Sequence, residues 1–190
     1  MRSGEFTAAM RSPVSPEVNL QPKEIEPGLL AYECPQSGGY WIPLPAYEQW
    51  KASQPPSDVI PASDQAVSVG PDPKRTALIC PESGVVMLRY KAGQGLPFHI
   101  DRSPATGGVW LDKGEWQALK QRGLHVDLNL IFTASYQRDL RSAEYAQSLE
   151  KVFQDRIGQP DFQRVAEFKE WMTRHPKHRD IMCYLSDKLK

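Results

Sequence analysis

Apolar residues recur with helical spacing through the last third of the chain. Phe132, Tyr136 and Leu140 follow one another at four-residue intervals, and an apolar stripe continues to Ile157. This spacing places the apolar side chains on one face of a helix. A glycine directly after Ile157, with a proline two residues later, predicts where that helix ends.

Two further helices are predicted towards the C-terminus. One spans residues 161–174, and the proline at 176 ends it. The last one carries Ile181, Leu185 and Leu189, again at four-residue spacing. We expect three amphipathic helices to bury their stripes against each other or against a partner.

The first two thirds of the chain show a different pattern. Short β-like runs at 85–90 and 96–100 flank a glycine-containing turn and predict a small hairpin. Short helices are expected near 46–51 and 113–122. Prolines, serines and aspartates dominate residues 51–75, which is typical of an extended linker. These elements together predict an α+β fold.

One sequence pattern occurs twice. Residues 34–41 read Cys-Pro-Gln-Ser-Gly-Gly-Tyr-Trp, and residues 103–110 read Ser-Pro-Ala-Thr-Gly-Gly-Val-Trp. Upstream of each copy stands a second turn, at 12–15 and at 80–83. The chain therefore reads as two copies of one module. The predicted organisation is a tag or disordered segment at 1–9, module one at 10–50, the linker at 51–75, module two at 76–125 and a helical region at 126–190.

The end of module two resembles a known family. Residues 107–115 read Gly-Gly-Val-Trp-Leu-Asp-Lys-Gly-Glu, which is similar to the tail of bacterial zinc ribbons of the transcription-factor-IIB type. The resemblance spans both modules, about 80 residues of the chain, and leaves out the helical region. It implies two β-hairpin ribbon modules, each holding zinc through four thiolates, and an association with transcription and nucleic acid.

The positions that correspond to the zinc ligands are mostly not cysteine. A structural zinc site needs four ligands such as thiolate, neutral histidine or carboxylate. Serine and threonine hydroxyls are not ionised near neutral pH and bind zinc poorly. We therefore predict that neither module binds zinc and that the protein has no cofactor. The corresponding positions are Ser12, Ser15, Cys34 and Ser37 in module one, and Cys80, Ser83, Ser103 and Thr106 in module two.

An alternative ligand set lies close to the second turn of module two. Cys80 together with His99 and Asp101 would supply a thiolate, an imidazole and a carboxylate. We favour the simpler interpretation, in which His99 is a strand residue and Asp101 a turn residue. Cys34 and Cys80 are then small, partly buried residues, and we expect Cys183 to be a packing residue of the last helix.

Without a metal, each module of about 40 residues needs another source of stability. Tryptophan side chains bury large areas and are the expected substitutes. Hydroxyl groups at the former ligand positions are expected to bind nearby backbone amides. The candidate core or interaction residues are Trp41, Trp50, Trp110, Trp116 and Trp171, and of these we expect Trp110 and Trp171 to be core residues.

Charge, apolar content and cysteine number favour a cytoplasmic protein over a membrane or secreted one. The chain has 190 residues with 23 basic and 23 acidic side chains, hence no net charge. We find no apolar run of membrane-spanning length and no signal-peptide pattern. Three cysteines do not form a disulfide framework. We expect a cytoplasmic protein without membrane contact.

The sequence offers little catalytic chemistry. None of the four histidines stands in a recognisable nucleophile–base pattern. Asp112 and Glu115 are spaced as a helix capping box, with Asp112 as N-cap, which we prefer to a paired-carboxylate site. We therefore expect a protein without enzymatic activity.

Two functions remain. Tryptophan-rich modules and amphipathic helices favour a scaffold that binds another protein. The alternative is a nucleic-acid-binding or transcription-associated accessory protein, with Arg89, Lys91 and Arg102 as candidate contacts. The sequence specifies neither the partner nor the oligomeric state, and it leaves open whether the two modules pack together.

Overall fold

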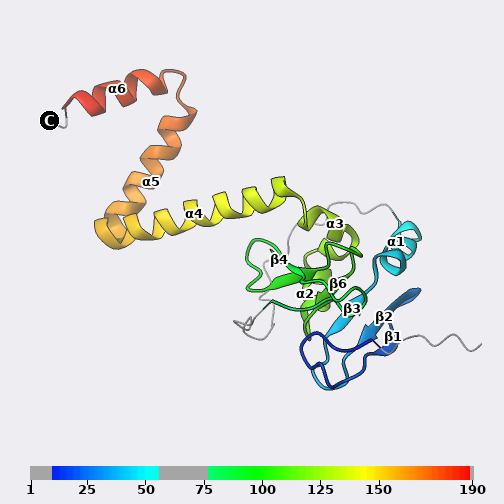
Figure 1. Cartoon of the computed structure of the whole chain (residues 1–190). Helices are drawn as coiled ribbons and strands as arrows, with labels where there is room; N and C mark the ends of the chain where they lie inside the picture. Colours follow the sequence, from blue (N-terminus) through cyan, green and yellow to red (C-terminus); the bar gives the residue numbers. More distant parts are fainter. Residues whose placement is uncertain (1–9, 56–76, 189–190) are drawn as a thin grey trace, which may run out of the picture. The chain divides into compact units, whose positions relative to one another are not determined.

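The computed structural model describes residues 10–55 and 77–188, which form an α+β fold (Figure 1). The chain divides into two compact units, which we call the N-terminal unit, Met1–Leu140, and the C-terminal unit, Arg141–Lys190. The predicted segment 1–9 and most of the predicted linker lie outside the described residues.

A six-stranded antiparallel sheet runs through the N-terminal unit in the order β1-β2-β3-β6-β5-β4. Module one supplies three consecutive strands, and module two supplies the other three. The predicted hairpin of module two corresponds to β4 and β5. The strands are β1 (Gln21–Glu26), β2 (Leu29–Glu33), β3 (Tyr40–Ile42), β4 (Leu88–Lys91), β5 (His99–Arg102) and β6 (Val109–Leu111).

The two modules are joined at the middle of this sheet. Strand β3 of module one pairs antiparallel with β6 of module two, and Trp41 lies directly opposite Trp110. Each module therefore contributes its third strand to the shared pair, and the two halves are related by an approximate two-fold axis at this point. The question that the sequence left open is answered, because the modules form one sheet and share its two cores.

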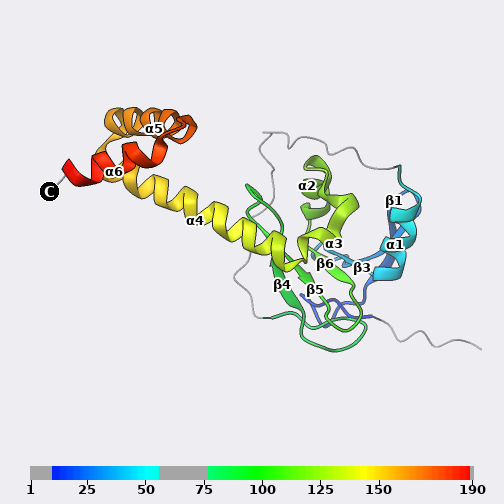
Figure 2. The ribbon, with the colours of Figure 1, turned by 90° about the horizontal axis from the view of Figure 1, so that it is seen from above.

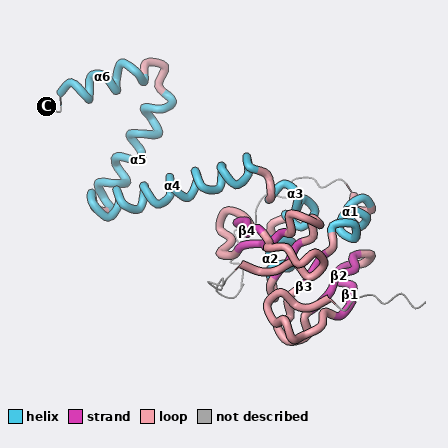
Figure 3. The backbone as a smooth tube through the Cα atoms, viewed as in Figure 1, coloured by secondary structure: helices cyan, strands magenta, loops and turns pink. Residues whose placement is uncertain are grey.

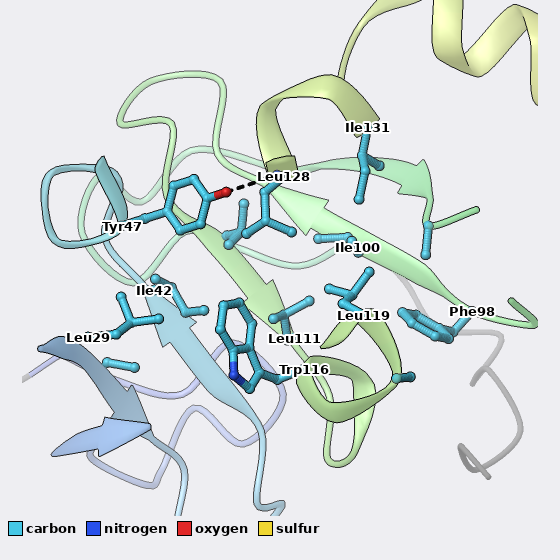
Figure 4. Close-up of a cluster of buried hydrophobic side chains, with 14 of the residues drawn as sticks. Leu29, Ile42, Tyr47, Phe98, Ile100, Leu111, Trp116, Leu119, Leu128 and Ile131 are labelled. Carbon is cyan, nitrogen blue, oxygen red and sulfur yellow. Dashed lines mark hydrogen bonds between the residues drawn. The ribbon is translucent and has the colours of Figure 1, made fainter. Parts of the chain in front are cut away.

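Four short helices cover one face of the sheet (Figure 2). Each module places one helix directly after its third strand. The core below contains Leu29 and Ile42 from module one, and Ile100 and Leu111 from module two (Figure 4). The helices are α1 (Leu44–Ala52), α2 (Glu115–Gln121), the 3₁₀ helix η1 (Leu124–Asp127) and α3 (Leu128–Ile131).

Turns and loops cover the opposite face (pink in Figure 3). A second, smaller core lies here, because residues alternate between the two faces of a strand. Trp41 and Trp110 point to this side and are fully buried, as expected for Trp110. They pack with Cys34 and Cys80, which are also buried.

Helix α4 (Ala134–Ile157) starts in the N-terminal unit and continues into the C-terminal unit. The predicted helix with Phe132, Tyr136 and Leu140 on one face is thus interrupted, because Phe132 lies between α3 and α4. Gln137 on the first turn binds both the backbone N–H and the carbonyl of Lys91, at 3.3 and 2.9 Å. This contact occupies part of the exposed edge of β4, in the place of a further strand.

Helices α5 (Gln159–Arg174) and α6 (His178–Lys188) follow α4 and agree with the two predicted C-terminal helices. Their side chains are less buried than expected. Trp171 is 52% exposed and Cys183 is exposed, so both expectations of core packing are wrong. The helices present these residues outwards, although their apolar periodicity is real.

Candidate functional site

The four turns at 12–15, 34–37, 80–83 and 103–106 share one hydrogen bond. In each turn, the side-chain sulfur or oxygen of the first residue accepts the backbone N–H of the fourth residue. Serine thus performs in this bond the same role as cysteine, as expected for a hydroxyl near a turn. The distances are 3.3 Å for Ser12–Ser15, 3.5 Å for Cys34–Ser37, 3.4 Å for Cys80–Ser83 and 3.2 Å for Ser103–Thr106.

The two turns of module two converge on Cys80. Its sulfur lies 3.8 Å from Oγ1 of Thr106. Burial raises the pKa of the Cys80 thiol, but hydrogen bonds from Ser103 and Ser83 outweigh burial and bring the pKa below its ordinary value. The structure therefore brings all four predicted positions of this module together around one sulfur.

Module one repeats the arrangement around Cys34. Burial raises the pKa of this thiol, while hydrogen bonds from Ser12 and Ser37 lower it, with a net pKa below the ordinary value. Ser12 is itself buried. Ser15 joins the group through its backbone N–H. Each module is thus held at this end by hydrogen bonds between hydroxyl, thiol and backbone groups.

One thiol with three hydroxyls does not fit zinc, which prefers thiolate and imidazole ligands. Throughout residues 10–55 and 77–188, no three histidine, cysteine, aspartate or glutamate side chains gather as a metal-binding group. The alternative set of Cys80, His99 and Asp101 is accordingly not assembled. Asp101 is a buried residue of strand β5, and the expectation that it lies in a turn is wrong.

Introducing cysteine at the three other turn positions of module two tests this geometry. We expect the Ser83→Cys, Ser103→Cys, Thr106→Cys variant to bind Zn²⁺ tetrahedrally, because its four sulfurs would occupy positions that already converge. Cobalt substitution would give thiolate charge-transfer bands, which the wild type would lack. At free zinc one hundred times Kd, the variant should gain about 2.7 kcal/mol of stability. A folded variant without these bands would show that the turns do not converge.

The backbone hydrogen bonds also refine the alignment of the repeat. Met87 donates its N–H to the Leu78 carbonyl, and Leu20 donates to the Met10 carbonyl. Leu20 is therefore equivalent to Met87, and both side chains are buried. Module one thus carries one additional residue in its first turn, where Ser12 bonds to Val18 and the equivalent Cys80 bonds to Val85.

A second polar cluster lies under the helices and was not predicted from the sequence. Oε1 of Glu26 accepts hydrogen bonds from Trp116 Nε1 at 3.0 Å and Lys120 Nζ at 2.5 Å. The His125 ring packs on Trp116 and Trp50, and its buried Nδ1 has no hydrogen-bond partner among the residues that the structure describes. Glu26 and Lys120 are 94 positions apart, so no local motif reveals the cluster.

This cluster predicts a loss of stability in acid. Burial lowers the pKa of His125, and the nearby Lys120 charge lowers it further, whereas Glu26 raises it. The unfolded chain then binds more protons than the folded one below about pH 6.5, and stability falls as pH falls. Burial raises the Glu26 pKa, but Lys120 and Trp116 lower it overall, so its contribution is lost at lower pH still.

Urea denaturation across pH 4 to pH 8 measures this effect. Just under pH 6.5, we expect the free energy of unfolding to fall by less than about 1.4 kcal/mol per pH unit, which is the largest slope that one proton can cause. His125→Phe should remove that slope and retain the decrease near pH 4. His178→Gln, at an exposed position, serves as the control and should leave the profile unchanged. An equal slope in His125→Phe and wild type would contradict the assignment.

The three candidate nucleic-acid contacts do not share a surface. Arg89 and Lys91 alternate along β4 with Leu88, which lies opposite Arg102. Because opposed residues share a face and neighbours alternate, Arg102 lies on the face opposite to Arg89 and Lys91. Its guanidinium is 4.9 Å from the Phe132 ring centroid.

The expected capping box is half formed. The Glu115 carboxylate accepts the backbone N–H of Asp112 at 2.7 Å. The N-cap itself is Gly114, with φ of +88°, so the prediction of Asp112 as N-cap is wrong. The Asp112 carboxylate instead accepts the Trp110 indole N–H at 2.9 Å. Both carboxylates therefore stabilise the loop that connects β6 to α2.

Comparison of the chain with protein-family models, curated proteins and solved structures finds no match. Among the helices of the described segments, none combines the length and apolarity needed to cross a membrane. Any assignment of function therefore rests on the residues and their geometry.

Proposed function

We propose that the protein is a non-enzymatic interaction scaffold, in which a metal-free, ribbon-like N-terminal unit carries a helical unit that binds another polypeptide. The observation that carries this proposal is the exposure of the C-terminal unit. Between Arg141 and Asp187 no side chain is buried. Isolated helices gain little stability from backbone propensity and depend on packing of their apolar faces.

Large apolar side chains form continuous exposed stripes on these helices. On α5, Val165, Phe168 and Trp171 recur every three residues, and the Phe168 and Trp171 ring centroids are 5.5 Å apart. An exposed stripe of this kind marks an interaction surface. The stripes comprise Tyr145, Leu149, Val152, Phe153 and Ile157 on α4, Val165, Phe168 and Trp171 on α5, and Met182 and Tyr184 on α6.

The N-terminal unit supports the scaffold role in another way. Its sheet is covered on both faces, by the helix-side core and by the core around Trp41 and Trp110. A unit closed in this manner supplies a stable base, and its former ligand positions are used for structural hydrogen bonds. The alternative, nucleic-acid binding, depends on the family resemblance and lacks a basic face formed by its three candidate contacts.

Affinity capture with the full chain tests the proposal. We expect a stoichiometric protein partner that survives nuclease treatment and high salt. The Phe153→Gln, Ile157→Gln variant should lose it, whereas Gln147→Ala on the same helix should retain it. Recovery that disappears with nuclease, together with strongly salt-dependent binding to DNA or RNA, would favour the nucleic-acid function instead.

A further inference from the structure

We propose that the partner of the helical stripes is a second copy of this chain, so that the protein is a homodimer formed through its C-terminal units. This inference rests on the proposed function and specifies its binding partner. It follows from the direction of the stripes, from their area and from the charge that surrounds them.

Helices α4 and α5 turn mainly polar side chains towards each other. An open groove of about 650 Å³ between α4 and α5 is lined by Gln147, Glu150, Lys151, Gln154, Asp155, Gln159 and Phe162. A smaller neighbouring groove of about 280 Å³ contains Glu150 from α4 with Lys169, Glu170 and Arg174 from α5. The stripe residues Phe153, Val165 and Trp171 line neither groove, so within residues 141–187 the C-terminal unit leaves its stripes exposed.

The exposed apolar area matches what a dimer requires. Five aromatic side chains of the stripes are 42–71% exposed, which corresponds to about 500 Å² of aromatic surface. With the aliphatic members, the area approaches the roughly 800 Å² that each partner contributes to a standard interface. A second copy offers an equal apolar area of the same chemistry to pack against.

The charges around the stripes suit a neutral, self-similar partner. Residues 141–190 contain 10 basic and 8 acidic side chains. On α5, Arg164 pairs with Asp161 and Arg174 pairs with Glu170 within the same helix. A strongly charged partner would find no excess of opposite charge here, and an anionic membrane favours a lysine- and arginine-rich face. Two copies meet without appreciable repulsion.

Light scattering coupled to size exclusion, with the purified full chain alone, tests the inference. We expect a mass of twice 21.5 kDa, which decreases towards the monomer on dilution. Phe168→Gln with Trp171→Gln should weaken the dimer at least about a hundredfold, since aromatic residues dominate interface energetics. Glutamine is a good helix former, so the helix should persist in circular dichroism.

A matched control substitutes the opposite face of α5. Gln163→Ala with Thr173→Ala, both exposed and about 140° from Phe168 on a helical wheel, should leave the dimer intact. If the α5 variant loses helicity, Phe153→Gln with Ile157→Gln on α4 repeats the measurement. A wild type that is monomeric at all concentrations, or stripe variants that dimerise like the wild type, would overturn the inference.

The same experiments separate this inference from the proposed function. A monomeric chain that still captures a different protein through its stripes would overturn the homodimer and leave the scaffold function in place. A homodimer that captures no further protein would support the inference and would restrict the scaffold function to self-assembly.

Discussion

Replacing Trp41 or Trp110 with alanine is expected to unfold the N-terminal unit or to leave it barely stable. Both side chains are fully buried and lie opposite each other in the strand pair that joins the modules. A buried tryptophan replaced by alanine costs about 3–5 kcal/mol through lost burial and the cavity left behind. Because a domain is stable by only about 5–15 kcal/mol, this is a large fraction of the total.

Urea denaturation followed by circular dichroism measures this loss. Trp171→Ala is the matched control, since it removes the same side chain from an exposed position and should shift the stability of the N-terminal unit by less than about 0.5 kcal/mol. We expect both module variants to shift the transition of the whole sheet, because the cores are shared. An unchanged midpoint for Trp41→Ala would show that the ring is not a core element.

Adding a single methyl group at Gly39 or Gly108 is expected to be nearly as destructive. A Cβ at Gly108 would lie 2.4 Å from Cζ2 of Trp41, and a Cβ at Gly39 would lie 2.4 Å from Cζ2 of Trp110. The two clashes are reciprocal and both involve a fully buried ring. Overpacking of a core costs about 1–3 kcal/mol, and we expect Gly→Ala here to reach the upper end.

A double-mutant cycle identifies the ring as the cause. Phenylalanine has a single ring and lacks the outer ring of the indole, which carries Cζ2. Gly108→Ala should therefore cost less stability in a Trp41→Phe background than in the wild type. Gly84→Ala gives a comparison without a clash, because no atom lies within 4 Å of its Cβ and only its φ of +70° is strained, whereas Gly39 and Gly108 do not have a positive φ. It should cost only about 1–2 kcal/mol. Equal costs of Gly108→Ala in both backgrounds would contradict the reciprocal contact.

The repeat and its turns could be predicted from the sequence because they depend on local chemistry. A Pro-x-x turn followed by Gly-Gly-x-Trp fixes a short hairpin, and the second glycine of each motif, Gly39 or Gly108, is required by a close contact. The partner of that contact was not predictable, since it belongs to the other module. The order of strands in the sheet depends on which strand edges remain unpaired after each hairpin has formed. The residues of β3 and β6 do not by themselves show that these two strands pair with each other.

The failures at Trp171 and Cys183 have a common cause. Apolar periodicity shows which face of a helix avoids water, but not which surface covers that face. We expected the three helices to bury their stripes against each other or against a partner, and in the C-terminal unit α4 and α5 face one another with polar residues instead. The cluster of Glu26, Lys120 and His125 was missed for a related reason, because its members come from distant elements that only the sheet brings together.

The reciprocal contact across β3 and β6 describes an interface that a single module could have made with an identical copy of itself. Trp41 contacts Gly108 of the other half, and Trp110 contacts Gly39. In a symmetric dimer, the same surface on both subunits makes such reciprocal contacts. Fusion of two such genes would make this association intramolecular and release the halves to diverge. Trp41 now donates to Glu82 of the other half, whereas Trp110 donates to Asp112 of its own. A homodimer of identical modules could not have evolved this division of roles.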